Sequence, residues 1–140
     1  MESRLLNSQL FEFRKLEWKG ENACGMVPVG DHILVLIDAA VEKSKGGIII
    51  TDDLLAKRQM AAETGTIVAM GEGAFYWNSE RSREFLGRKP KPGDHIMFAR
   101  YAGRFITGND GHHYRVMIDK EVAGIATDDG FTVSVLDQTS

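Results

Sequence analysis

The sequence has little of several features that define large classes of protein. It holds one cysteine, Cys24, among 140 residues, which excludes an internal disulfide and a zinc site built from cysteines. No apolar run approaches the roughly 18 to 20 residues that a membrane-spanning helix needs. The net charge is only −3, so a basic field over the whole chain is excluded as a basis for nucleic-acid binding.

The N-terminus lacks the continuous apolar stretch of a signal peptide. Charged residues, among them Glu2, Arg4 and Glu12, interrupt its leucines and phenylalanines. A chain of this length suits one domain with a single hydrophobic core. The composition therefore predicts a small soluble protein of the cytoplasm.

The chain also lacks the patterns that mark catalytic and metal sites. His112 and His113 are adjacent, so on a strand they would point to opposite faces and could not easily share a metal. Residues 71–73 read Gly-Glu-Gly, but position 76 is a tyrosine where a dinucleotide-binding motif needs glycine. Cys24 has no evident base beside it in the sequence. We therefore expect no enzyme, no metal and no cofactor.

Short apolar segments separated by glycine or aspartate predict an all-β domain. These segments are rich in β-branched and aromatic residues, and their spacing is typical of a barrel or a sandwich. The Asp110-Gly111 pair indicates a tight turn between two strands. The expected strands are residues 32–37, 65–70, 95–98, 114–118, 122–126 and 131–136.

Two segments are ambiguous between helix and strand or loop. Leu6, Leu10 and Phe13 follow a helical spacing, which favours an amphipathic helix, but the alternation of Phe11 and Phe13 leaves a strand open. Residues 51–62 contain good helix formers behind a threonine and two aspartates.

Residues 44–51 read SKGGIIIT and carry the strongest signal outside the core. Two glycines permit a sharp turn, and three consecutive isoleucines follow. Because side chains alternate along a strand, the three cannot all face one core. Either this segment is buried on both faces, or at least one isoleucine is exposed to bind a partner.

Six short motifs follow one another between Pro28 and Ala126. They are Pro28-x-x-Asp31 with Ile33-Leu34-Val35, Lys43-Ser44-x-Gly46-Gly47-Ile48-Ile49-Ile50-Thr51, Gly65-Thr66-Ile67-Val68-Ala69-Met70-Gly71-x-Gly73, Lys91-Pro92-Gly93-Asp94, Tyr101-Ala102-Gly103, and Glu121-Val122-Ala123-Gly124-Ile125. Each is weak alone, but in this order they resemble the small co-chaperonin family, GroES and its relatives. His32 stands where that family usually has arginine.

The resemblance implies a GroES-like irregular β-barrel over residues 26–126. Such protomers form a heptameric ring that caps an ATP-driven GroEL-type chaperonin and encloses a client protein. Residues 43–60 would be the mobile loop, which argues against a stable helix over residues 52–62. The residues implied in chaperonin binding are Gly46, Gly47, Ile48, Ile49 and Ile50.

The resemblance also implies a subunit interface and a roof hairpin over residues 74–91. The interface would join Met26, Val27 and Val29 to Val122, Ala123 and Ile125. The roof or dome residues would be Phe75, Tyr76, Trp77, Arg81, Arg83, Phe85 and Tyr101. We interpret the roof as a hairpin whose aromatic residues pair across strands. A dome suited to an unusual client, or RNA stacking on the basic aromatic segment, are the alternatives.

The chain departs from the family at both ends. Residues 1–25 and 127–140 are extensions, and we expect the first to pack on the ring wall or to project toward the client chamber. This divergence fits a bacteriophage source, in which case the protein would work in the host cytoplasm. The alternative function is a stand-alone β-barrel protein-binding module without a chaperonin partner.

Overall fold

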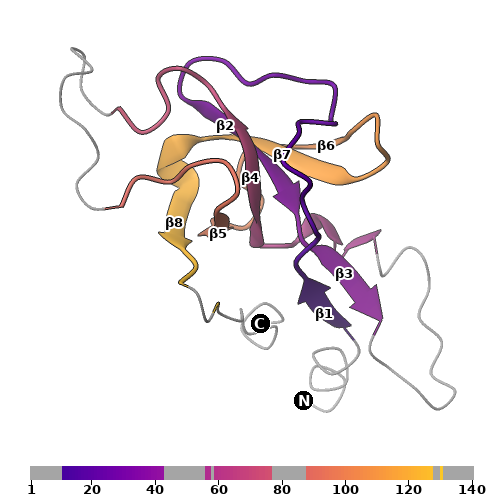
Figure 1. Ribbon diagram of the computed structural model, residues 1–140. Coiled ribbons are helices and arrows are strands. Elements are labelled where there is room, and N and C mark those ends of the chain that lie inside the picture. The colour runs from indigo at the N-terminus through magenta and orange to yellow at the C-terminus, as the bar shows by residue number, and fades with distance from the viewer. Residues whose placement is uncertain (1–10, 43–55, 58, 77–87, 128–129, 131–140) are drawn as a thin grey trace, which may run out of the picture.

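The computed structural model describes residues 11–42, 56–57, 59–76, 88–127 and 130 (Figure 1). These residues form two antiparallel sheets, one of two strands and one of six. The strands are β1 (Phe11–Arg14), β2 (His32–Ile37), β3 (Ala39–Glu42), β4 (Thr64–Met70), β5 (His95–Phe98), β6 (Arg104–Thr107), β7 (His113–Ile118) and β8 (Val122–Ile125). A short 3-10 helix, η1 (Asp119–Glu121), separates the last two strands.

The larger sheet has the order β6-β7-β2-β4-β5-β8, and every pairing in it is antiparallel. The strands expected over residues 32–37, 65–70, 95–98, 114–118 and 122–126 are confirmed, with ends that differ by one residue at most. The Asp110-Gly111 turn joins β6 to β7, as expected. These strands confirm the all-β prediction. The strand expected over residues 131–136 lies outside the described residues.

Strand β2 is buried on both of its faces. Ile33, Val35 and Ile37 point into the main core cluster, whereas Leu34 and Leu36 point into a second cluster on the opposite side of the sheet. Period-two alternation sends neighbouring side chains to opposite faces, so an unbroken apolar run such as HILVLI needs cover on both sides.

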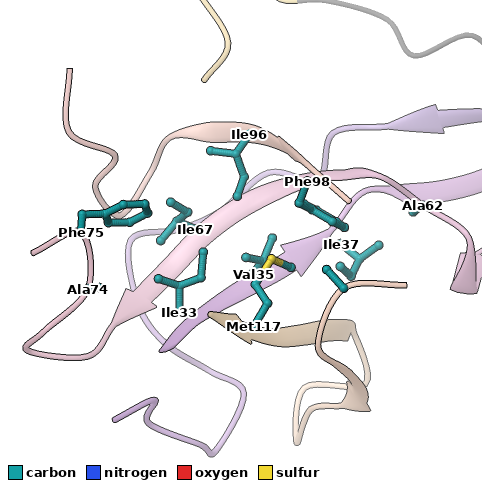
Figure 2. Packing of buried hydrophobic residues seen from close by; sticks show 11 residues of the cluster. Ile33, Val35, Ile37, Ala62, Ile67, Ala74, Phe75, Ile96, Phe98 and Met117 are labelled. Atoms are coloured by element: carbon teal, nitrogen blue, oxygen red, sulfur yellow. The ribbon is translucent and has the colours of Figure 1, made fainter. Parts of the chain in front are cut away.

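The main cluster lies inside the curl of the six-stranded sheet (Figure 2). It collects side chains from central and peripheral strands, including Ile67 of β4, Ile96 and Phe98 of β5, and Met117 of β7. Residues from strands so far apart meet one cluster only if the sheet bends around it. Register irregularities in the β2–β4 and β5–β8 pairings are of the kind that increase such bending.

The curled sheet has two open edges in the described part of the chain. Strands β6 and β8 end the sheet, and no ladder joins one to the other among the described residues. The irregular β-barrel expected from the family is thus observed as a curled sheet, without closure by hydrogen bonds between β6 and β8.

The second face of the sheet is covered by the chain that follows β1. Cys24 is part of the second cluster, and Leu16, Trp18 and Met26 pack against it. Most of this segment belongs to the expected N-terminal extension, which therefore contributes to the protomer's own core.

The favoured N-terminal helix is wrong at its described end. Residues Phe11–Arg14 form β1, which pairs antiparallel with β3 and places Phe13 opposite Ala40. The alternation of Phe11 and Phe13 was the correct signal, because pairing with β3 supplies the strand's backbone hydrogen bonds. The other residues of the helical spacing, Leu6 and Leu10, lie outside the described residues.

Residues 56–57 and 59–60 have helical conformation, at the end of the segment whose composition favours a helix. Residues 51–55 lie outside the described residues. Within the described ranges, no helix has the length and apolar character that crossing a membrane requires.

Replacing Trp18 with alanine tests whether the N-terminal segment is part of the core. We expect Trp18→Ala to lower the free energy of unfolding by about 1 to 3 kcal/mol, because it uncovers the second face of β2. Urea denaturation at neutral pH measures the change. The exposed neighbour Lys19 serves as the control, and Lys19→Ala should shift stability by less than about 0.5 kcal/mol. Equal stability of the two variants would contradict this role.

Candidate functional site

The glycine and isoleucine residues predicted to bind a partner, Gly46, Gly47, Ile48, Ile49 and Ile50, lie outside the described residues. The two ends of their segment are described. β3 ends at Glu42, and the chain reaches Gln59 on the other side. We call the residues 38–42 and 59–63 the loop root.

Gln59 joins the two sides of the loop root. Its side-chain amide donates to the Asp38 carbonyl at 2.7 Å, and its Oε1 accepts from the Ala40 backbone N–H at 2.8 Å. One amide side chain thus makes two hydrogen bonds to the backbone at the start of β3. Eighteen residues separate Ala40 from Gln59 in the sequence, yet one hydrogen bond joins the two.

Arg115 of β7 also binds the loop root, from inside the curled sheet. Its guanidinium donates to the carbonyl oxygens of Met60 and Ala102, the latter at 2.9 Å. The ring centroids of Phe98 and Phe105 lie 5.8 and 5.9 Å from its central carbon, within range of a cation–π contact. Burial lowers the pKa of Arg115, but arginine keeps its charge in proteins. A buried cation therefore ties the loop root to the β5–β6 connection.

A buried polar cluster lies next to the loop root. Asp38 Oδ2 accepts from the Thr64 hydroxyl at 2.6 Å and contacts His95 Nε2 at 2.7 Å. The threonine hydroxyl is bonded to the carboxylate rather than to the histidine, so the three groups do not form the nucleophile–base pair of a catalytic triad. We interpret the cluster as structural. Among the described residues, no group of three or more histidine, cysteine or acidic side chains could hold a metal.

The predicted interface residues fall at two places on the protomer surface. Val27 and Val29 are each 74% exposed, while Pro28 between them is buried. Val122 and Ile125 lie on β8, an edge strand, and Val122 is half-buried against the main core. Of the other two, Met26 packs on the second cluster and Ala123 is exposed on β8. Met26 and Val122 thus pack on different core clusters.

A shallow apolar groove runs along the β8 edge. Its volume is about 330 Å³. Its lining consists of Met97, Gly124, Ile125, Ala126, Thr127 and Gly130. Gly124 has open space where a side chain would be. This edge can therefore accept the backbone and small apolar side chains of another strand.

The predicted roof residue Phe75 is a core residue at the start of the expected roof segment. Its side chain is 1% exposed and packs in the main cluster (Figure 2). Its backbone has a φ of +65°, and its N–H donates to the buried carboxylate of Asp119 at 2.6 Å. This left-handed conformation is costly for phenylalanine and persists because burial and the Asp119 bond over-determine it. Phe75 therefore cannot belong to a dome surface.

The ends of the roof segment are held close to the sheet. The ammonium of Lys89 lies 3.4 Å from the centroid of the Tyr76 ring, a cation–π contact between the two described ends of this segment. Arg88 donates to Asp94 at 2.7 Å. The other predicted roof residues, Trp77, Arg81, Arg83 and Phe85, lie outside the described residues.

Tyr101 projects from the β5–β6 connection. It is 64% exposed and has a φ of +64°, so it shares the left-handed conformation of Phe75. The next glycine, Gly103, has a φ of +62°, and a Cβ there would lie 1.9 Å from the Val116 carbonyl oxygen. Only glycine fits at that position, and it keeps the tyrosine loop tight against β7.

Asp110 and Tyr114 form a short hydrogen bond beside the N-terminal segment. The tyrosine hydroxyl donates to Asp110 Oδ2 at 2.5 Å. Burial, together with this bond to an ionised carboxylate, raises the pKa of Tyr114 far above its usual value. Burial works against ionisation of Asp110, but the bonds from Tyr114 and the His112 backbone outweigh it and lower the pKa of Asp110. Burial and Asp110 also raise the pKa of the Cys24 thiol, which makes it a poor nucleophile.

Sequence reasoning missed Gln59 and Arg115. Arg115 carries a usable signal, because it occupies the same face as Met117 in an apolar strand, where a charge must find partners. Gln59 carries no such signal, since its partners are backbone groups of residues about twenty positions away.

Comparison with known proteins gives consistent matches over the central part of the chain. Residues 25–126 match the family described as Chaperonin 10 Kd subunit. The co-chaperonin GroES of Bacillus sp. (strain PS3) is 32% identical over 98 residues, which are 70% of this chain and 95% of that protein. The co-chaperonin GroES of Rhodopseudomonas palustris is 35% identical over 98 residues, 70% of this chain and 94% of that protein.

Tyr114→Phe tests the Asp110–Tyr114 pair and its dependence on pH. At neutral pH we expect a loss of about 0.5 to 1.5 kcal/mol in the free energy of unfolding. The pKa of the folded tyrosine lies above that of the unfolded one. The wild type should therefore keep the extra free energy of unfolding from this bond below about pH 10 and lose it as the pH rises further. The variant has no such bond, so its stability should not show this loss.

Urea denaturation of both proteins at pH 7 and pH 10.5 measures this effect. The mostly exposed Tyr101 provides the matched control, and Tyr101→Phe should retain the wild-type alkaline dependence. A Tyr114→Phe variant that loses as much stability as the wild type between the two pH values would refute the coupling.

Proposed function

This chain belongs to the Chaperonin 10 Kd subunit family and is a co-chaperonin, and we propose that it forms a heptameric ring that caps a GroEL-type chaperonin. In this proposal ATP binding by the chaperonin promotes capture of the ring, and the capped cage encloses a client protein. The chaperonin, not this chain, supplies the ATP chemistry. The site of action is the cytoplasm of the cell that holds the chaperonin.

One observation carries the proposal at the level of residues. The segment with the isoleucine triplet lies within the family match, and its two ends are tied together by Gln59. In this proposal, a long segment anchored at a single point presents a short apolar sequence to a partner. Ile48, Ile49 and Ile50 are that sequence, and Gly46 and Gly47 permit the turn that displays it.

The energetics of such a loop suit reversible capture. A segment that orders on binding loses conformational entropy, so each contact is weak in spite of its apolar anchors. In a ring, the first bound loop brings the others to a high effective concentration, which makes the whole assembly bind firmly. A modest weakening of every site by the chaperonin's ATP cycle then releases the entire ring.

We assign the subunit interface to the exposed valines and the β8 edge. Val27 and Val29 expose apolar side chains that water solvates poorly, and β8 offers unpaired backbone groups beside an apolar groove. In the ring, the segment 26–29 of one protomer lies along β8 of its neighbour, near Val122, Ala123 and Ile125. This head-to-tail contact repeats around a closed ring.

The roof would face the enclosed client. Tyr76 and Tyr101 are the described members of this surface, since Phe75 is buried in the core. Trp77, Arg81, Arg83 and Phe85 complete it in the proposal. The mixture of aromatic and basic side chains would favour a client with acidic surface patches.

Charged substitutions in the triplet test the loop. We expect Ile48→Asp and Ile50→Asp to abolish capture by a GroEL-type chaperonin with ATP, because burial of one isoleucine contributes about 1.5 to 3 kcal/mol in every loop of the ring. A pull-down measures capture, and light scattering checks that the ring persists. Ala56→Asp, at an exposed site of the same loop, is the control and should bind. Normal capture by the Ile48 variant would exclude this loop as the contact.

Val27→Asp tests the interface. A charge at this site would be buried against β8 in the ring without a partner, so we expect the heptamer to dissociate. Size-exclusion chromatography with light scattering gives the mass. Thr107→Asp places the same charge on exposed β6 and should leave the ring intact. A wild-type protein that is monomeric at micromolar concentration would argue against the ring and for a stand-alone binding module.

A further inference from the structure

The N-terminal segment lies outside the family match but contacts the loop root directly. The match begins at residue 25, whereas β1 covers Phe11–Arg14. The only strand that β1 pairs with in the described chain is β3, whose last residue, Glu42, precedes the loop. Figure 1 shows β1 beside β3 at the point where the chain leaves the larger sheet.

Strand β3 is held at both edges. β1 pairs with it over four residues, from Phe11 opposite Glu42 to Arg14 opposite Ala39. The Ala40 backbone N–H is bonded to Gln59 instead, and successive backbone groups of a strand point to opposite edges. Gln59 and β1 therefore bond to opposite edges of β3.

β1 is itself anchored to the body of the protomer. Phe13 packs against the main core cluster, and Leu16 and Trp18 pack on the second cluster a few residues later. The Trp18 indole N–H also donates to the Glu21 carbonyl at 2.8 Å. A pair of short strands is marginal alone, but these anchors make β1 a fixed support for β3.

We propose that β1 acts as a brace that orders the root of the chaperonin-binding loop and thereby strengthens capture of the chaperonin. A loop whose root is already ordered loses less entropy when it binds, so its apparent affinity rises. Because the segment precedes the family match, the brace is an addition to the family's fold. This inference rests on the proposed function of the loop.

The experiment weakens the brace in the full-length chain. Glu12→Pro interrupts β1, and Phe13→Ala removes its anchor in the core. Lys15→Ala, at an exposed site just after β1, is the matched control. Hydrogen exchange of the Ala39 and Val41 amides, which face β1, reports the brace without any partner. Titration of a GroEL-type chaperonin with ATP and labelled rings reports affinity, and amides of β2 and β4 report overall folding.

In both brace variants the β3 amides should exchange about tenfold faster, and the chaperonin should bind about five- to tenfold more weakly. The amides of β2 and β4 should keep their protection. Lys15→Ala should match the wild type in both measurements. Unchanged β3 exchange, or faster exchange with unchanged or stronger capture, would overturn the inference. If the wild type itself fails to bind, the proposed function fails. The claim that the brace strengthens chaperonin capture is then wrong as well. The exchange data still decide separately whether β1 supports β3.

Discussion

The structure depends on the burial of β2 from both sides. Ile33, Val35 and Ile37 require one hydrophobic layer, and Leu34 and Leu36 require another. The sheet supplies the first by curling on itself, since strands from β7 through to β8 in its order pack on the same cluster. The second layer is completed by Leu16, Trp18 and Cys24, which precede the family-matched region. The described part of the extension thus contributes to the core.

Several polar side chains beside this core bond to backbone groups, and these bonds hold the ends of two loops. Arg115 and Gln59 hold the loop root through carbonyl and amide groups. Asp119 holds the foot of the roof through the Phe75 N–H. Unpaired burial of such groups would cost more than each bond contributes. The same bonds that satisfy the core therefore position the two segments proposed to meet the chaperonin and the client.

Sequence patterns predicted the all-β class and the central strands because alternation and tight-turn residues are local signals. They failed where the deciding partner is distant along the chain. The helical spacing of Leu6, Leu10 and Phe13 was misleading, since pairing with β3 determines the conformation of residues Phe11–Arg14. The family resemblance puts Phe75 in the roof, whereas its left-handed φ and the bond of its N–H to Asp119 accompany a side chain buried in the core. Gln59 could not be found from sequence at all.

The loop-root contacts have a consequence for how this protein can change over time. Arg115 donates to the carbonyls of Met60 and Ala102, and Gln59 bonds to the Asp38 carbonyl and the Ala40 N–H. Neither contact depends on the side chain of its partner. Mutations along the loop leave this anchorage intact as long as the backbone path is kept. The recognition sequence proposed for this loop could therefore diverge toward a different chaperonin while the anchorage of its two ends stays the same.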